Sequence, residues 1–211
     1  MEYRARNFDH LVKGLSGFSE KLMKNHLSLY QGYVKQTNHL ATALLRMDRL
    51  GKNGHPEYAE LKRRFGWEFN GMRLHELYFE NLIKRSTPLN KQSALGDRMR
   101  RDFGRLDTWK KSFLGVGGMR GIGWVILAHD TRADRFFNVW INEHDTGLLV
   151  GAMPLLVMDV FEHAYLQDYG LNRAAYMQAF MNAIDWAVVE QRFGMFRQTP
   201  GRMAAVRRAV S

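Results

Sequence analysis

The residues best suited to chemistry in this chain are histidines and carboxylates, because the sequence contains no cysteine. Without thiolates, imidazole and carboxylate groups are the strong ligands left for a transition metal. Asp159 ends the apolar run of residues 154–158, and His163 follows it four residues later. A carboxylate at the end of a buried strand is costly unless a cation or hydrogen-bond donors meet it. The pair therefore predicts either part of a metal site or a buried Asp159–His163 ion pair without metal. A turn after the strand is the expected geometry, rather than one face of a helix.

Two further histidines, His26 and His75, lie in segments with helical periodicity. Tyr30 and Tyr33 follow His26 at i+4 and i+7, so the three side chains share one helix face. His75 lies among aromatic residues. If the two helices pair antiparallel, both imidazoles can point into one crevice. Together with the aspartate and the third histidine they would give three imidazoles and one carboxylate, a set that suits iron, manganese or zinc.

The elements that must position these side chains differ between the two halves of the chain. Apolar residues recur with a period near 3.6 over residues 18–50 and 56–83, and the segment GKNGHPEY between them is rich in turn residues. This pattern predicts an antiparallel helical hairpin. A linker is expected at residues 86–90, because Pro88 disfavours helix at the residue before it.

The second half predicts a helix at about residues 93–111, followed by a change of period. Three short apolar runs, at residues 124–128, 136–141 and 154–158, have strand length and turn residues around them. Helical patterns return over residues 173–193, and a basic tail is expected after about residue 195. The predicted fold class is therefore α+β. An N-terminal α-hairpin domain would span residues 1–87, and a C-terminal domain with a three-stranded antiparallel sheet and surrounding helices would span residues 88–211.

Composition narrows the classes of partner. The chain has 211 residues, 45% hydrophobic and 25% charged, which is ordinary for a soluble globular protein. No apolar run approaches the roughly 20 residues that cross a bilayer, and the N-terminus does not resemble a secretory signal. We therefore expect a cytoplasmic protein with no membrane partner. The net charge of +10 would attract anions, whether nucleic acid or a small charged substrate.

Residues 159–176, DVFEHAYLQDYGLNRAAY, resemble the signature of the iron/manganese superoxide dismutases, in which Asp-x-Trp-Glu-His-Ala-Tyr precedes Asp-Tyr and Asn-x-Arg. The segments HLSLYQGYVKQTN, HELYFENL and GIGWVIL resemble other parts of that family, in the same order. The resemblance covers nearly the whole chain, weakly at residues 84–112 and not beyond about residue 195. It implies conversion of superoxide to dioxygen and hydrogen peroxide at a mononuclear centre whose metal is alternately reduced and oxidised.

The resemblance also implies roles for particular residues. One iron or manganese ion per subunit would be bound by His26, His75, Asp159 and His163, with a solvent molecule as fifth ligand. Tyr33 corresponds to the family's gateway tyrosine, Trp124 to an aromatic wall beside the metal, and Arg173 to an arginine that shapes a basic entrance. Glu162 corresponds to the residue that reaches the partner's metal-binding histidine, which implies a homodimer through Glu162 and His163.

Several positions depart from the family pattern. Phe161 stands where the family has tryptophan, which keeps an apolar wall but removes an indole donor. The step from His26 to Tyr33 is seven residues instead of the usual eight, which still leaves both on one helix face. Tyr30 and Leu166 replace a histidine and a tyrosine that normally meet across the dimer interface, so that bridge is expected to be absent.

The group that donates a hydrogen bond to the coordinated solvent also differs. Many members use a glutamine from the second helix or from the loop after the second strand. The helix position is Gly71, and the loop, residues 142–145, reads NEHD. His144 is the predicted donor and would help Tyr33 deliver protons. Glu143 is the alternative, although two carboxylates in one dry pocket would cost more than a neutral imidazole. A solvent-facing His144 is the third possibility.

Two other classes of protein share part of this pattern. A non-haem iron oxygenase uses two histidines and a carboxylate but leaves several metal positions open, which four protein ligands oppose. A basic nucleic-acid-binding protein would need a recognition module, and the sequence contains no such motif. We therefore expect superoxide as the partner and no nucleic acid. The sequence leaves open whether iron, manganese or either is used, and whether the assembly is a dimer or a tetramer.

Overall fold

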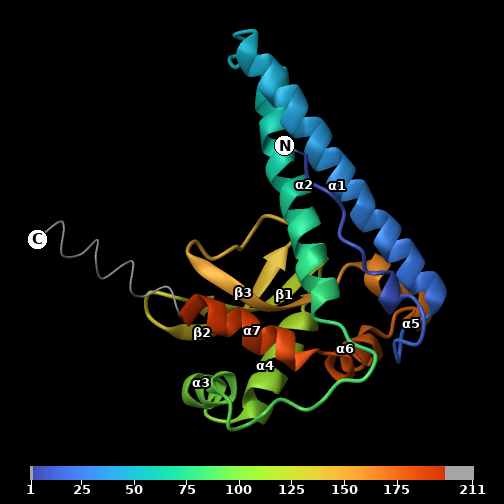
Figure 1. Ribbon diagram of the computed structural model, residues 1–211, viewed down its shortest axis with the longest axis vertical. Helices are drawn as coiled ribbons and strands as arrows, with labels where there is room; N and C mark the ends of the chain where they lie inside the picture. The colour runs from blue at the N-terminus through green and yellow to red at the C-terminus, as the bar shows by residue number, and fades with distance from the viewer. Residues whose placement is uncertain (1, 198–211) are drawn as a thin grey trace, which may run out of the picture.

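The computed structural model describes residues 2–197, so the predicted basic tail lies outside the described residues from residue 198 onward. A short 3₁₀ turn, η1 (Asp9–Leu11), precedes two long helices, α1 (Glu20–Arg49) and α2 (Pro56–Glu80). These run antiparallel and project beyond the rest of the molecule (Figure 1). The predicted helical hairpin is confirmed.

Local chemistry fixes the ends of the hairpin helices. Ser19 caps α1 by accepting a hydrogen bond from the Leu22 amide at 3.0 Å. Gly51, at φ 66°, turns the chain after α1, and Pro56 opens α2, where its missing N–H costs nothing. Facing residues such as Leu40, Leu44 and Met47 are buried along the pair. The packing of α1 against α2 therefore fixes the positions of His26 and His75 relative to each other along the hairpin.

The prediction of a single helix at residues 93–111 is wrong. The chain forms two helices there, α3 (Ala94–Phe103) and α4 (Leu106–Gly117). Gly104 separates them at φ 75°, a left-handed conformation that glycine adopts without steric cost and that cannot continue a helix. An isolated glycine within a helical pattern is compatible with either outcome, so the pattern alone did not reveal the break.

The three predicted strands form the expected antiparallel sheet. They are β1 (Gly123–Asp130), β2 (Arg135–Asn142) and β3 (Ala152–Asp159), in the spatial order β2-β1-β3. The register places Trp124 opposite Asp159 on β3. Gly123 has φ 152°, and a side chain there would lie 1.9 Å from the Ile141 carbonyl oxygen. Only glycine allows β1 and β2 to approach at this point.

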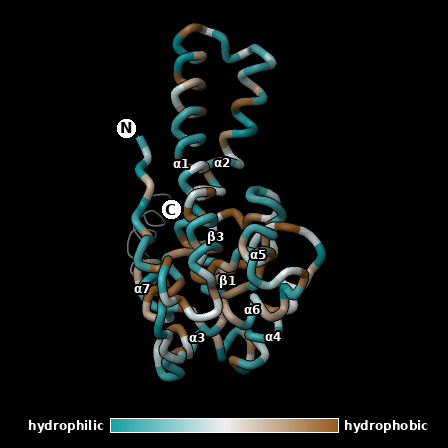
Figure 2. The backbone as a smooth tube through the Cα atoms, turned by 90° about the vertical axis from the view of Figure 1, so that its right-hand side faces the viewer, coloured by the Kyte–Doolittle hydropathy of each residue, from teal (hydrophilic) through white to brown (hydrophobic). Residues whose placement is uncertain are grey.

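The remaining elements close the body around the sheet. They are η2 (Glu162–Ala164), α5 (Leu166–Tyr169), α6 (Arg173–Asn182) and α7 (Trp186–Arg197). Arg192 on α7 is buried and donates to Asn81 Oδ1 at 2.5 Å and to the Leu155 carbonyl at 2.9 Å, which ties the end of α2 to β3. Hydrophobic segments gather around the sheet (Figure 2). Within residues 2–197, no helix combines the length and apolar character needed to cross a membrane.

Candidate metal centre

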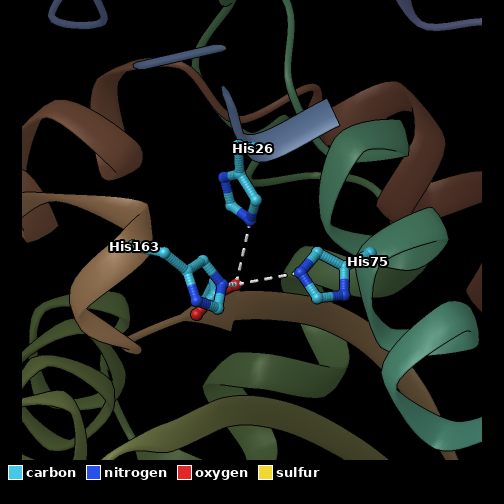
Figure 3. A group of neighbouring side chains, drawn as sticks. His26, His75 and His163 are labelled. Atoms are coloured by element: carbon cyan, nitrogen blue, oxygen red, sulfur yellow. Dashed lines mark hydrogen bonds and ion pairs between the residues drawn. The ribbon is translucent and has the colours of Figure 1, made fainter. Parts of the chain in front are cut away.

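Four side chains from four separate elements meet between the hairpin and the sheet. His26 comes from α1, His75 from α2, Asp159 from the last position of β3 and His163 from η2. Their potential ligand atoms all lie within 4.8 Å of one another. The Asp159 Oδ2 atom lies 3.1 Å from Nε2 of His26, 3.1 Å from Nε2 of His163 and 3.7 Å from Nε2 of His75. Figure 3 shows the three imidazoles pointing toward this shared position.

The strand end and the turn after it place Asp159 and His163. The Val160 amide donates to the Gly123 carbonyl at 2.9 Å and closes the sheet edge. The Phe161 amide then donates to Asp159 Oδ1 at 2.8 Å, which leaves Oδ2 facing the histidines. The chain turns into η2 and returns His163 to the same carboxylate. This is the predicted turn geometry rather than a helix face.

Burial and the contacts within the cluster favour the protonation states of His26, His75 and Asp159 that bind a metal ion. Burial lowers the pKa of His26 and His75, so both imidazoles are neutral at pH 7. Burial opposes ionisation of Asp159, but the adjacent imidazoles of His163 and His26 outweigh it and hold that carboxyl's pKa well below its usual range. An ionised carboxylate and neutral imidazoles are the forms that coordinate cations.

Two buried nitrogens of this cluster, His26 Nδ1 and His75 Nε2, have no hydrogen-bond partner among the described residues, and the second faces the Asp159 carboxylate. His75 Nδ1 donates to the Gly71 carbonyl at 2.6 Å, which leaves the lone pair on Nε2 facing the cluster. That Nε2 is buried and has no hydrogen-bond partner among the described residues. A buried acceptor is costly when unpaired, and a bound cation would satisfy it. The donor set therefore fits an iron or manganese ion, as it would zinc, and the Gly71 carbonyl already orients the His75 ring through its Nδ1–H.

A second layer of hydrogen bonds links the predicted outer residues. His144 is fully buried, so it does not face solvent. Its Nδ1 accepts from Trp124 Nε1 at 3.0 Å, and its Nε2 lies 2.8 Å from the Tyr33 hydroxyl. Burial lowers the pKa of His144 to about 4, so the ring is neutral at pH 7. Because an indole N–H can only donate, Nε2 carries the single ring proton and donates it to the Tyr33 oxygen. The hydrogen bond predicted from His144 to a coordinated solvent molecule stays a prediction, since the partners of this ring in the structure are Trp124 and Tyr33.

The alternative donor, Glu143, lies outside this pocket. Its side chain is exposed, and its Oε2 accepts from Trp67 Nε1 at 3.1 Å. Two carboxylates therefore do not share the dry site.

Phe161 forms an apolar wall of the site, as predicted for the position at which the family has tryptophan. Its ring stacks on His144 at 4.8 Å and on His163 at 5.1 Å between ring centroids.

Arg173 lies outside the four-residue cluster. Its guanidinium donates to the carbonyls of Met119 and Gly121, each at 2.8 Å, and contacts the Tyr165 hydroxyl at 3.3 Å. In this structure it braces the glycine-rich segment before β1. Arg64 is a nearby cation whose charge slightly opposes the rise in the pKa of Tyr33 and adds a little to the lowering of the pKa of His144.

Sequence reasoning missed Arg64 and Trp67. The Trp67 ring lies 4.3 Å from His144 and 5.6 Å from Tyr33 between centroids. A signal was present, because Trp67, Gly71 and His75 follow one another at intervals of four residues and so share one face of α2.

Gly71 makes room for Tyr33. A Cβ at this position would lie 2.7 Å from the Tyr33 ring atoms Cδ1 and Cε1. We expect Gly71→Ala to lower the free energy of unfolding by about 1–3 kcal/mol, the usual cost of overpacking. Gly66→Ala in the same helix is the matched control, because nothing lies within 4 Å of its Cβ. That change should raise stability by about 0.5–1 kcal/mol. Denaturant unfolding measures both values, and equal effects would contradict the close packing.

Comparison with known proteins agrees with this geometry. The family model of the iron/manganese superoxide dismutases, C-terminal domain, matches residues 91–192. The chain is 36% identical to a superoxide dismutase [Fe] of Cupriavidus metallidurans, over 85% of this chain and 90% of the relative. It is also 36% identical to a superoxide dismutase [Fe] of Aquifex pyrophilus, over 88% and 89%. A superoxide dismutase [Mn] of Haloferax volcanii is 33% identical over 77% and 79%. Since the two iron-containing relatives are each 36% identical over more than four fifths of both chains, the chain belongs to the iron/manganese superoxide dismutase family.

Proposed function

We propose that this chain is a superoxide dismutase whose single iron or manganese ion is held by His26, His75, Asp159 and His163. The observation that carries the proposal is the convergence of four ligand atoms within 4.8 Å. The buried and unpaired Nε2 of His75 faces the same place. When bound, the ion would supply the one-electron steps that turn two superoxide ions and two protons into dioxygen and hydrogen peroxide.

The protein's own residues would manage the protons. Burial, reinforced by the negative charges of Asp159 and Glu68, raises the pKa of Tyr33, so its hydroxyl stays protonated. Its oxygen accepts the His144 proton, so its own hydrogen can be donated onward into the site. Trp124 fixes His144 from the other side. This one-way order of donors supports Tyr33 as the proton donor to the substrate and His144 as the group that orients it.

The decisive experiment is reconstitution with single metals. Metal-free protein would be loaded separately with iron, manganese and zinc, with metal per subunit and superoxide consumption measured in each case. We expect about one ion per subunit, and dismutation with iron or manganese. Zinc is the control, because it fits histidine and carboxylate ligands but has no redox chemistry. Inactivity of both the iron-loaded and the manganese-loaded protein would refute the proposal.

The basic charge of the chain should speed the encounter with superoxide. The net charge is +10, and the Arg64 side chain is half exposed beside the Tyr33–His144 pair. We expect kcat/KM to fall as ionic strength rises from about 0.01 M to about 0.15 M, because the Debye length contracts from about 30 Å to about 8 Å. Stopped-flow rates in a salt whose anion does not bind metals measure this, and a flat response would rule out steering.

We also propose a cytoplasmic homodimer formed through Glu162 and His163. Glu162 is exposed, and the His163 side chain is 27% exposed, whereas those of His26 and His75 are closed off from solvent. A partner's carboxylate could thus reach this ring. Tyr30 instead bonds within the chain, to Glu76 at 3.0 Å. Sedimentation velocity of the parent and of Glu162→Ala tests the interface, since a monomeric parent would exclude it.

A further inference from the structure

A hydrogen bond between the exposed Glu143 and the half-buried Trp67 joins the loop after β2 to helix α2. We propose that this pair, here called the latch, is a positioning device that sets the His144–Tyr33 hydrogen bond. The proposal rests on the proposed dismutase function, in which that bond orients the proton donor. It concerns residues that touch neither the metal ligands' coordinating atoms nor the substrate.

The loop that carries the latch is tight and strained at one residue. Asn142 and Thr146 exchange backbone hydrogen bonds of 2.8 and 3.3 Å, which closes the turn. Glu143 has φ 50°, in the left-handed region that glycine and asparagine adopt more readily than glutamate. This conformation sends the His144 side chain inward and the Glu143 side chain outward. The strained backbone therefore aims both side chains, and glutamate is not the residue that the turn itself favours.

Trp67 is a rigid anchor for this loop. The Arg64 guanidinium lies 4.0 Å over the centre of its ring. Arg64 is itself held by Glu68, with Nε and Nη2 at 2.8 and 2.7 Å from the same carboxylate oxygen. The indole is thus fixed on one face by a cation and at its N–H by Glu143. Because Trp67 and His75 lie on the same helix, α2, the position of Trp67 is fixed relative to the candidate metal site.

The latch acts on His144 through direct contact. Trp67 meets the His144 ring edge-on, with centroids 4.3 Å apart and planes at 71°. The neutral His144 has a single N–H, and that proton goes to Tyr33. A small movement of the loop would lengthen that one bond, and no second ring N–H is available to replace it. Glu143 thus adopts a backbone conformation that glutamate disfavours and is hydrogen-bonded to the residue that packs against His144, and this geometry carries the proposal.

The test compares two amide variants of one residue. Glu143→Gln keeps an acceptor oxygen at the same reach, whereas Glu143→Asn is one methylene shorter and cannot span to Trp67, although asparagine suits the left-handed backbone. In the metal-loaded enzyme we expect E143N to lower kcat about tenfold with metal content unchanged, because small misplacements of catalytic groups are costly. E143Q should retain most of the parent kcat. E143N should nevertheless be at least as resistant to unfolding as the parent.

Trp67→Phe removes the other partner of the latch and retains an aromatic ring. We expect its loss of kcat to resemble that of E143N, and the double variant to lose little more, since coupled residues are not additive. Hydrogen exchange in the metal-free chain supplies a readout independent of activity. The amides of residues 143–146 should exchange faster in E143N and W67F than in the parent or E143Q.

The outcomes separate the latch from the proposed function. If the parent is an active dismutase and E143N keeps its kcat and its amide protection, the latch is overturned. If the parent is inactive with iron and with manganese, the proposed function fails, and the exchange data still decide whether the latch restrains the loop. If E143Q falls as far as E143N, charge rather than reach is responsible, and the positioning proposal is wrong.

Discussion

Asp159→Ala is expected to leave the protein without tightly bound iron or manganese and without measurable dismutation. Its Oδ2 is the atom on which His26, His75 and His163 converge, within 3.1 to 3.7 Å. It also supplies the negative charge of the cluster. The loss should exceed the roughly 10–100-fold that removal of an outer hydrogen bond to a metal site costs. Metal analysis and superoxide assays on the same preparation measure both effects.

An exposed aspartate provides the control for this change. Asp107 is exposed and lies 3.8 Å from Arg105, so Asp107→Ala alters the net charge equally while leaving the cluster intact. This variant should keep full metal and activity. Asp159→Asn adds a second test, because it preserves shape but removes the charge. Retention of one ion per subunit and of activity in Asp159→Ala would show that the metal lies elsewhere.

His144→Ala is expected to keep the metal but lower kcat about 100-fold, a typical effect of removing a group that assists proton transfer. The change leaves the Trp124 N–H without its acceptor and the Tyr33 oxygen without its donor. It also opens a cavity behind the Phe161 ring, which stacks on the imidazole at 4.8 Å. Stability should therefore fall as well, and steady-state kinetics corrected for metal content isolates the catalytic part.

A glutamine at this position gives the matched comparison. Its carbonyl can accept from Trp124 while its amide donates to Tyr33, and the amide has a second N–H that the neutral imidazole lacks. His144→Gln should thus recover most of the rate lost in His144→Ala. Its reduction potential should differ from that of the parent, because a new donor faces the site. Equal kcat values in the parent and His144→Ala would remove His144 from the proton route.

The hairpin and the three strands followed from the periodicity of apolar residues, since each element buries one continuous face or a whole strand. The break between α3 and α4 could not be predicted in this way, because a single glycine is tolerated in many helices. Whether the helix continues depends on the backbone angle at Gly104, which the sequence does not give. The candidate metal ligands could also be predicted from the sequence. The absence of cysteine leaves histidine and carboxylate, and Asp159 and His163 flank a strand end.

By itself, the sequence determined which residue types were available to bind a metal and on which elements they lie. The tertiary structure decided which atoms of the second layer meet. The side chains of the adjacent residues Glu143 and His144 point in opposite directions. With a φ angle of 50° at Glu143, the Glu143 side chain points outward to Trp67 and the His144 side chain points inward to Tyr33. These partners are 76 and 111 residues distant in the chain. Contacts across such distances depend on how α2 packs against the sheet, and no local pattern of residues encodes that packing.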